Sequence, residues 1–181
     1  MNIKKTGSIL LLICALGASA QKFKSSNSYI RFYSDAPMED IEAVNEASTS
    51  IIDLGSSSIV FVIPIASFEF PKKLMQEHFN ENYLESDKYP KAIFKGKIEQ
   101  WNGSDGANSA TAKGELEIHG VKNQVEISGE VNKSAGGVTI TAVFPIRLED
   151  YKIKIPKAVF YKIAEEVEVT VKFEYLPYEK N

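Results

Sequence analysis

The sequence contains very little cysteine and, after its first twenty residues, no long hydrophobic run. Cys14 is the one cysteine among 181 residues. If the first twenty residues are removed, the remaining chain has no cysteine for disulfides, thiol nucleophiles or thiolate metal sites, even in an oxidising compartment. No later apolar stretch is long enough to cross a bilayer, so we expect no stable membrane span.

The first twenty residues have the pattern of a secretory signal peptide. Lys4 and Lys5 supply a positive start, residues 9–16 form a short apolar run, and Ala18-Ser19-Ala20 fits the small-residue rule for signal peptidase. The pattern predicts that residues 1–20 are a signal peptide removed after Ala20. It also predicts that residues 21–181 form the folded domain and that the protein is periplasmic or secreted.

Two other interpretations of this segment stay open, although each has a feature against it. A membrane anchor would need a longer apolar run than residues 9–16 provide. A lipoprotein signal would end at Cys14, but Ile13 stands where such a signal has a small residue. It would also cut the apolar run in half.

Positive charge is scarce as well. The chain has 21 Lys and Arg residues against 24 Asp and Glu residues, and the loss of Lys4 and Lys5 changes the net charge from -3 to -5. No basic stripe is present that could neutralise phosphates. We therefore expect neither nucleic acid nor an anionic membrane surface as a partner.

What the sequence has in abundance is alternation of apolar and polar residues. In residues 167–175, Val, Phe and Tyr side chains alternate with Glu, Thr and Lys, which is the pattern of a half-buried strand. The same period of two predicts strands at 29–34, 38–45, 48–54, 57–66, 91–101, 112–118, 121–131 and 138–148. Short turn signals such as His119-Gly120 separate them, so we expect one antiparallel barrel or sandwich. A barrel is favoured because it leaves no open edges.

One segment breaks this period. Residues 71–84 open with a proline and place Leu74, Met75, Phe79 and Tyr83 at spacings of three and four, which predicts a short amphipathic helix between two halves of the sheet. We expect its apolar stripe to pack on the barrel or to close one end. Residues 59–66 are apolar on both faces, so the helix is predicted to cover their outer side.

Several positions on the predicted inner face carry small residues, namely Gly96, Ala112, Gly114, Gly129 and Ala142. A barrel of about eight strands is just wide enough either to fill itself with side chains or to hold one small ligand. Small inward residues favour a ligand cavity lined by aliphatic and aromatic side chains. Alternatively, the glycines mark bulges and bends of the strands. The sequence leaves both possibilities open.

Catalytic and metal-binding patterns are missing. His119 falls on the polar face at a turn, which predicts a solvent-facing or turn-capping side chain, and His78 is predicted to be partly buried and hydrogen-bonded on the helix. Glu77 and Glu81 lie near His78 without any spacing typical of a metal site. No nucleophile elbow or phosphate loop is present. We therefore predict a protein that is not an enzyme and has no metal or cofactor.

Two segments resemble the YceI-like family. Residues 77–94 read EHFNENYLESDKYPKAIF, similar to the family's short helix followed by K-[FY]-P-x-A-x-F, and residues 114–125 read GELEIHGVKNQV, similar to G-x-L-T-I-H-G-V. The resemblance implies an all-β fold: an eight-stranded antiparallel, lipocalin-like barrel with one short helix inserted between strands. It also implies a long apolar tunnel that binds polyisoprenoid lipids in an exported protein.

The resemblance has two gaps. Residues 26–32 lack the histidine that many members carry in the first strand, and residues 147–151 match the late R-x-D-F-G motif only loosely. Because these positions differ, the chemistry that would hold a polar head group does not transfer to this chain.

The leading hypothesis is an exported barrel that binds, sequesters or transports an isoprenoid or other long-chain apolar lipid. The alternatives are a stress-response or partner-binding protein with a filled barrel, and an enzyme acting on a tunnel-bound substrate. A homodimer is left open. Strand parity and the helical stripe predict these ligand contacts: Met75, Phe79, Tyr83, Phe94, Leu116, Val125, Ile127, Ile140, Phe144 and Val169.

Overall fold

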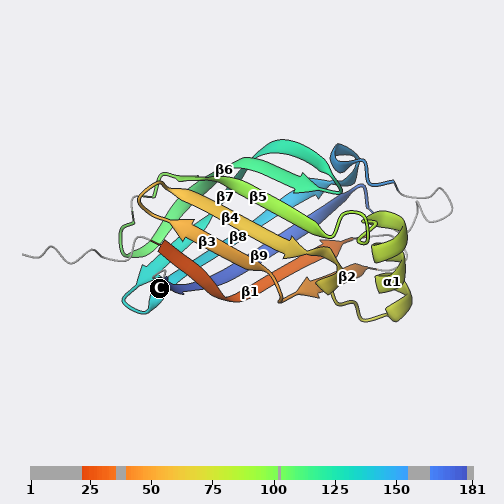
Figure 1. The fold of residues 1–181 in the computed structure, drawn as a ribbon, viewed down its shortest axis with the longest axis horizontal. Coiled ribbons are helices and arrows are strands. Elements are labelled where there is room, and N and C mark those ends of the chain that lie inside the picture. Colours follow the sequence, from red (N-terminus) through yellow and green to blue (C-terminus); the bar gives the residue numbers. More distant parts are fainter. Residues whose placement is uncertain (1–21, 36–39, 102, 155–163, 179–181) are drawn as a thin grey trace, which may run out of the picture.

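The computed structural model describes residues 22–35, 40–101, 103–154 and 164–178 (Figure 1). The predicted signal peptide, residues 1–20, lies outside this part. None of the helices in the described ranges combines the length and the apolar character needed to cross a membrane.

The described chain folds into an antiparallel meander that closes on itself (Figure 1). Each strand pairs with the next along the chain, except that β1 has both β2 and β3 as partners, and the last strand, β9, pairs with β1 to complete the ring. The strands are β1 (Lys22–Ser34), β2 (Ile41–Asn45), β3 (Thr49–Asp53), β4 (Ser58–Pro64), β5 (Lys91–Glu99), β6 (Gly106–Ile118), β7 (Val121–Ser134), β8 (Gly137–Arg147) and β9 (Glu166–Pro177).

Nine strands fill eight positions of the barrel because β2 and β3 share one. β2 pairs with residues 30–34 of β1, and β3 pairs with residues 22–24 of the same strand. The two therefore lie end to end along β1. The predicted all-β fold, an eight-stranded antiparallel barrel with one short helix between strands, is confirmed.

A buried asparagine shapes the break between β2 and β3. Asn45 is fully buried, its Oδ1 accepts hydrogen bonds from the Ala47 amide and the Ser48 hydroxyl, and its Nδ2 donates to the Pro64 carbonyl at 2.8 Å. These bonds satisfy the polar groups of a chain that leaves the sheet for three residues.

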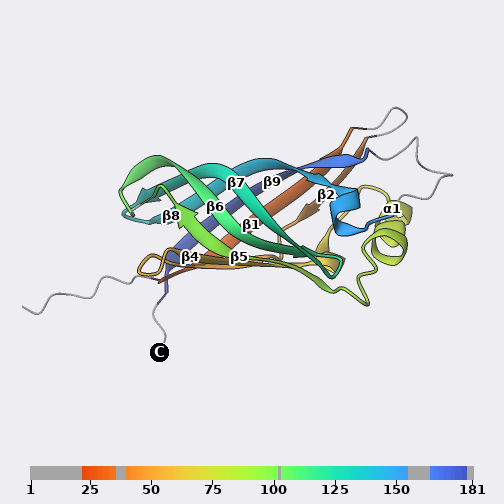
Figure 2. The ribbon, with the colours of Figure 1, turned by 90° about the horizontal axis from the view of Figure 1, so that it is seen from above.

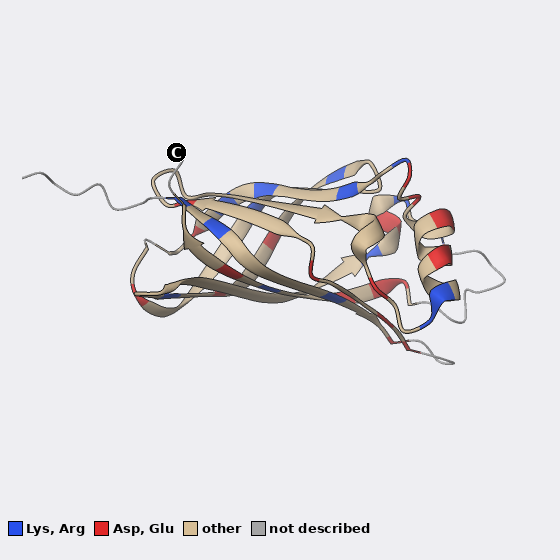
Figure 3. Ribbon diagram, turned by 60° about the horizontal axis from the view of Figure 1, so that its bottom comes forward, with Lys and Arg blue, Asp and Glu red and all other residues tan. Residues whose placement is uncertain are grey.

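Alternation along the strands separates a hydrophobic interior from a charged exterior. Buried positions include Ile52, Phe94, Leu116 and Val169, and the residues next to them along each strand are more exposed. In the view of Figure 3, positions of both charge signs are interspersed over strands and helix. Each strand predicted from the sequence is present, but two begin much earlier than predicted: β1 starts at Lys22 instead of residue 29, and β6 starts at Gly106 instead of residue 112.

The helical segment lies at one end of the barrel (Figures 1 and 2). It comprises the turn η1 (Ile65–Ser67), helix α1 (Lys73–His78) and the π-helical turn η2 (Phe79–Tyr83). The prediction that it covers the outside of residues 59–66 is wrong. Val60 and Val62 point outward from β4 and stay half-exposed, beside Ile51 on β3, which is 43% exposed.

The two ends of the barrel differ. At the end opposite α1, which we call the plugged end, large side chains fill the interior. Trp101 is buried there, just past the end of β5, and donates its indole N–H to the Ser104 carbonyl at 3.1 Å. The other end, which we call the helix end, carries α1 and the short helix η3 (Leu148–Tyr151). The buried residues of the plugged end include Phe23, Ile52, Trp101, Val138, Phe173 and Tyr175.

Candidate functional site

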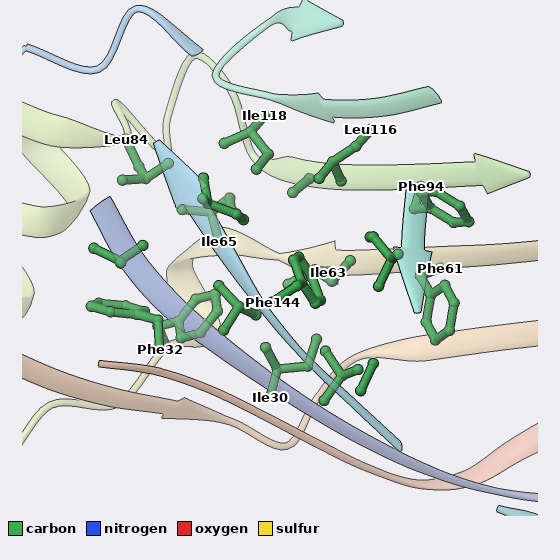
Figure 4. Close-up of a pocket in the computed structure, with 18 of the residues that line it drawn as sticks. Ile30, Phe32, Phe61, Ile63, Ile65, Leu84, Phe94, Leu116, Ile118 and Phe144 are labelled. Atoms are coloured by element: carbon green, nitrogen blue, oxygen red, sulfur yellow. The ribbon is translucent and has the colours of Figure 1, made fainter. Parts of the chain in front are cut away.

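The barrel contains a cavity of about 460 Å³ that extends from the helix end toward the plugged end. Inward-facing side chains of β1, β4, β5, β6, β7, β8 and β9 line it, together with residues of the helical segment. The side chains labelled in Figure 4 are aliphatic or aromatic and point into this space. Its lining includes the buried side chains of Ile59, Ile98 and Val131.

Small residues account for part of the empty volume. Ala112, Gly129 and Ala142 line the cavity, as predicted from their inward positions. Gly96 and Gly114 have a different role, because they face each other in register on β5 and β6. A Cβ at either glycine would lie within 2.4 Å of a backbone oxygen of the neighbouring strand. These two glycines permit a close strand approach, which differs from both possibilities that the sequence left open, a cavity lining and a strand bulge or bend.

Aromatic rings gather where the helical segment meets the barrel. The Phe32 ring on β1 lies 5.5 Å from both Phe68 and Phe79 and 5.6 Å from Phe70, measured between centroids. Such contacts fix ring positions beyond simple area burial. We call these four residues the aromatic cluster, and it forms the wall of the cavity at the helix end.

The opening beside this cluster is bordered by helix residues. Leu74 is 62% exposed although it lines the cavity, and Met75 is half-buried next to it. Burial raises the pKa of Tyr83, so its hydroxyl stays neutral at physiological pH. The helix therefore presents an apolar edge to solvent at the mouth of the cavity.

Nine of the ten predicted contact residues line this one cavity: Met75, Phe79, Tyr83, Phe94, Leu116, Ile127, Ile140, Phe144 and Val169. Val125 is the exception. It is half-buried against the core but does not line the cavity. It lies in the part of β7 that has separated from β8, two residues beyond Ile127, which still lines the cavity. Whether the nine contact a ligand stays a prediction.

The structure corrects both histidine predictions. His78 is exposed on α1, where it borders the cavity mouth, instead of being partly buried. His119 is at the predicted turn, but its side chain is 12% exposed and does not face solvent. The backbone of His119 has φ +52°, so the strand alternation from which its outward direction was inferred ends there.

His119 joins three parts of the helix end. Its Nε2 lies 2.7 Å from a Glu85 carboxylate oxygen, its Nδ1 lies 3.2 Å from the Tyr151 carbonyl, and Tyr89 packs edge-on at 4.6 Å. The hydrogen bond with His119 lowers the pKa of Glu85. The contacts of His119 thus connect the β6–β7 hairpin to η3 and to the loop before β5. No pattern of local spacing could have shown it, because the partners are 34 and 32 residues apart.

Few polar side chains border the cavity. They are Ser34, His78, Tyr83, Glu130 and Thr141. Arg147 at the end of β8 does not border the cavity, because its side chain is exposed and paired with Glu149. Within the described ranges, no group of three or more His, Asp or Glu side chains is placed to hold a metal ion. The arrangement is suited to enclosing an apolar molecule.

Solved structures share this architecture. BcnA of Burkholderia cenocepacia aligns with a TM-score of 0.70 and 19% identity, over 81% of this chain and 95% of that one. A polyisoprenoid binding domain of Saccharophagus degradans, implicated in plant cell wall breakdown, aligns with a TM-score of 0.76 and 15% identity, over 86% and 98%. The YCEI protein of Campylobacter jejuni aligns with a TM-score of 0.58 and 17% identity, over 99% and 100%.

At these identities the structural likeness shows the fold alone. A comparison with curated proteins found no match. The family comparison is more specific, because the model of the YceI-like domain matches residues 22–175, which include the entire barrel up to Tyr175 in β9. The chain therefore belongs to the YceI-like family.

Proposed function

We propose that this protein binds an isoprenoid-type lipid inside its barrel and sequesters or transports it. The observation that carries the proposal is the apolar cavity of about 460 Å³, open at the helix end. Its volume lies within the range of about 300–1,000 Å³ found for small-molecule sites. The Saccharophagus degradans neighbour, a polyisoprenoid binding domain with the same fold, supports this ligand class.

The composition of the cavity lining determines which interactions would supply the affinity for a ligand. Most lining residues are Ile, Val, Leu, Phe or Ala, so affinity would come from apolar area removed from water, at about 25 cal/mol per Å². No lysine or arginine lines the cavity in the described part of the chain. A polar head group would therefore stay at the helix end, near solvent, while the hydrocarbon chain occupies the interior.

We further propose that the lipid is bound after export. The support is the signal-peptide pattern of residues 1–20. Fractionation of expressing cells, with N-terminal sequencing of the mature protein, tests this. A chain beginning at Gln21 outside the cytoplasm is expected, whereas an intact Met1 in the cytoplasm would overturn the proposal.

The primary test is native mass spectrometry of the exported protein, followed by organic extraction of anything bound. A co-purifying prenyl lipid at one per chain is the expected result. A clean protein mass that does not change after incubation with prenyl lipids would contradict the proposal and favour a partner-binding protein.

A cavity-filling variant makes the test specific to the site. Ala112 lines the cavity, so Ala112→Phe places a ring where the hydrocarbon would lie. Val62→Phe is the matched control, because Val62 points outward from β4 and does not line the cavity. We expect Ala112→Phe to weaken lipid binding by about tenfold or more, since two displaced methylenes already account for that factor. Equal binding by both variants would place the ligand elsewhere.

A further inference from the structure

The wall of the barrel is split between β7 and β8 on the side of the helix end. The two strands pair from Ser134 opposite Gly137 to Gly129 opposite Ala142, and the remaining residues of these fully described strands form no pairs with each other. Residues 121–128 of β7 still pair with β6, and residues 143–147 of β8 still pair with β9. We call the space between these two segments the β7–β8 slot.

Exposure changes where the strands separate. On the paired side of this point, inward-facing Val131 and Ile140 are 2% and 8% exposed. Past it, Ile127 and Phe144 on the same inner faces are only half-buried. Outward-facing Val143 is 58% exposed, beside the slot. On the same strands and the same face, exposure therefore rises where the two strands stop pairing.

The cavity reaches this slot. Gly129 and Ala142, the last pair before the strands part, line the cavity, and so do Glu130 and Thr141. Ile127 and Phe144, the inward-facing residues just beyond this pair, line the cavity as well. The cavity therefore extends along the inner side of the wall to the point where the two strands part.

A hydrogen bond keeps η3 at the far end of the slot. The Asn123 side chain on β7 donates to the Asp150 carbonyl on η3 at 2.8 Å. Leu148, at the start of η3, lines the cavity. The slot thus has apolar borders and a defined far end in the described part of the chain.

We propose that the β7–β8 slot is a lateral opening through which the chain of a bound lipid leaves the barrel. The ligand class is then a single apolar chain longer than the interior, such as a long polyprenyl chain. The borders favour hydrocarbon, because Ile127, Phe144 and Val143 are apolar and the carboxylate of Glu130 would repel an anionic head group. This inference rests on the proposed function and adds a chain-length preference to it.

A disulfide across the slot tests the opening. Ser128 and Val143 would be the next pair in register after Gly129 and Ala142, and both side chains are exposed outside the barrel. Ser128→Cys with Val143→Cys, in a Cys14→Ser chain, would close the slot without placing atoms in the cavity. Asn132→Cys with Thr139→Cys is the matched control, because this pair is already in register.

Binding of farnesol, a short prenyl alcohol, and of solanesol, a long one, is measured before and after oxidation. We expect the oxidised slot variant to bind solanesol about tenfold more weakly or worse, because each pair of methylenes returned to water costs about that factor. Farnesol binding and the control variant should stay unchanged. Solanesol binding that survives oxidation would overturn the lateral opening alone. A wild-type chain that binds neither alcohol would overturn the proposed function as well.

Photolabelling of the unmodified chain keeps the inference testable if the disulfide does not form. A long prenyl alcohol with a diazirine at its hydrocarbon end is bound and irradiated, and the labelled peptides are mapped. Labels within residues 121–128 or 143–147 are expected. Labels confined to α1 or to the interior near Val131 and Val138 would contradict the proposal.

Discussion

The plugged end and the helix end of the barrel are built from the same strands but differ in how completely side chains fill them. At the plugged end, Phe173 and Tyr175 are 0% and 1% exposed. At the helix end, inward-facing Phe32 and Phe144 are only half-buried and border a cavity. The comparison indicates a division of roles, in which the plugged end supplies most of the stability and the helix end supplies room for a ligand.

The largest expected effect comes from truncating the same residue type at each end. Phe173 packs at 4.8 Å from the Phe61 ring, and Phe173→Ala should lower the free energy of unfolding by about 3–5 kcal/mol. Phe144 already borders empty space, so Phe144→Ala should cost about 1–2 kcal/mol. Urea denaturation measures the free energy of unfolding of both variants. Equal losses would contradict the proposed difference in stability between the two ends.

A smaller effect is expected from a hydrogen bond at the plugged end. Tyr175 donates its hydroxyl to the Ser50 hydroxyl at 2.7 Å, and burial raises the pKa of Tyr175, so the donor proton is retained. Tyr175→Phe should cost about 1 kcal/mol. A double-mutant cycle with Ser50→Ala isolates the pair, and a coupling energy near zero would show that the hydroxyls do not stabilise this end.

The smallest effect should appear at the helix end and depend on pH. The hydrogen bond with His119 lowers the pKa of Glu85 in the folded chain, so the contact stabilises the protein above the ordinary Glu pKa. That contribution is lost as pH falls below the ordinary Glu pKa and through the lowered value of the folded chain. Thermal unfolding of wild type and Glu85→Gln across this range should show a smaller loss on acidification for the variant. Parallel curves for the two proteins would contradict this.

Most of the fold followed from alternation, because each strand has one apolar face. The period of two located the strands, and together with the helical spacing in residues 74–83 it placed nine of ten chosen residues around one cavity. The break in this period at residues 71–84 located the helical segment, which the structure forms from Lys73 to Tyr83. Periodicity shows on which face of its own strand or helix a residue lies. These predictions required only that information.

What the sequence could not show depends on contacts between distant segments. Residues 41–45 and 49–53 alternate like separate strands, and only their pairing with β1 reveals that they share one position. His119 appeared solvent-facing because Glu85 and Tyr151 are far away in sequence. Val125 has the parity of a lining residue, but β7 has left β8 at that point. A hydropathy pattern does not show where two neighbouring strands stop pairing.

The pairing of β1 with β9 also constrains how the chain folds. Phe23 lies opposite Pro177, so the barrel closes only when its first and last strands meet. Contacts between residues so distant in sequence form slowly, and until they form one side of each of these two strands has no partner. A chain that lacks β9 would keep these edges open and would be prone to aggregation. Completion of the last strand is therefore the step at which this protein becomes a closed barrel.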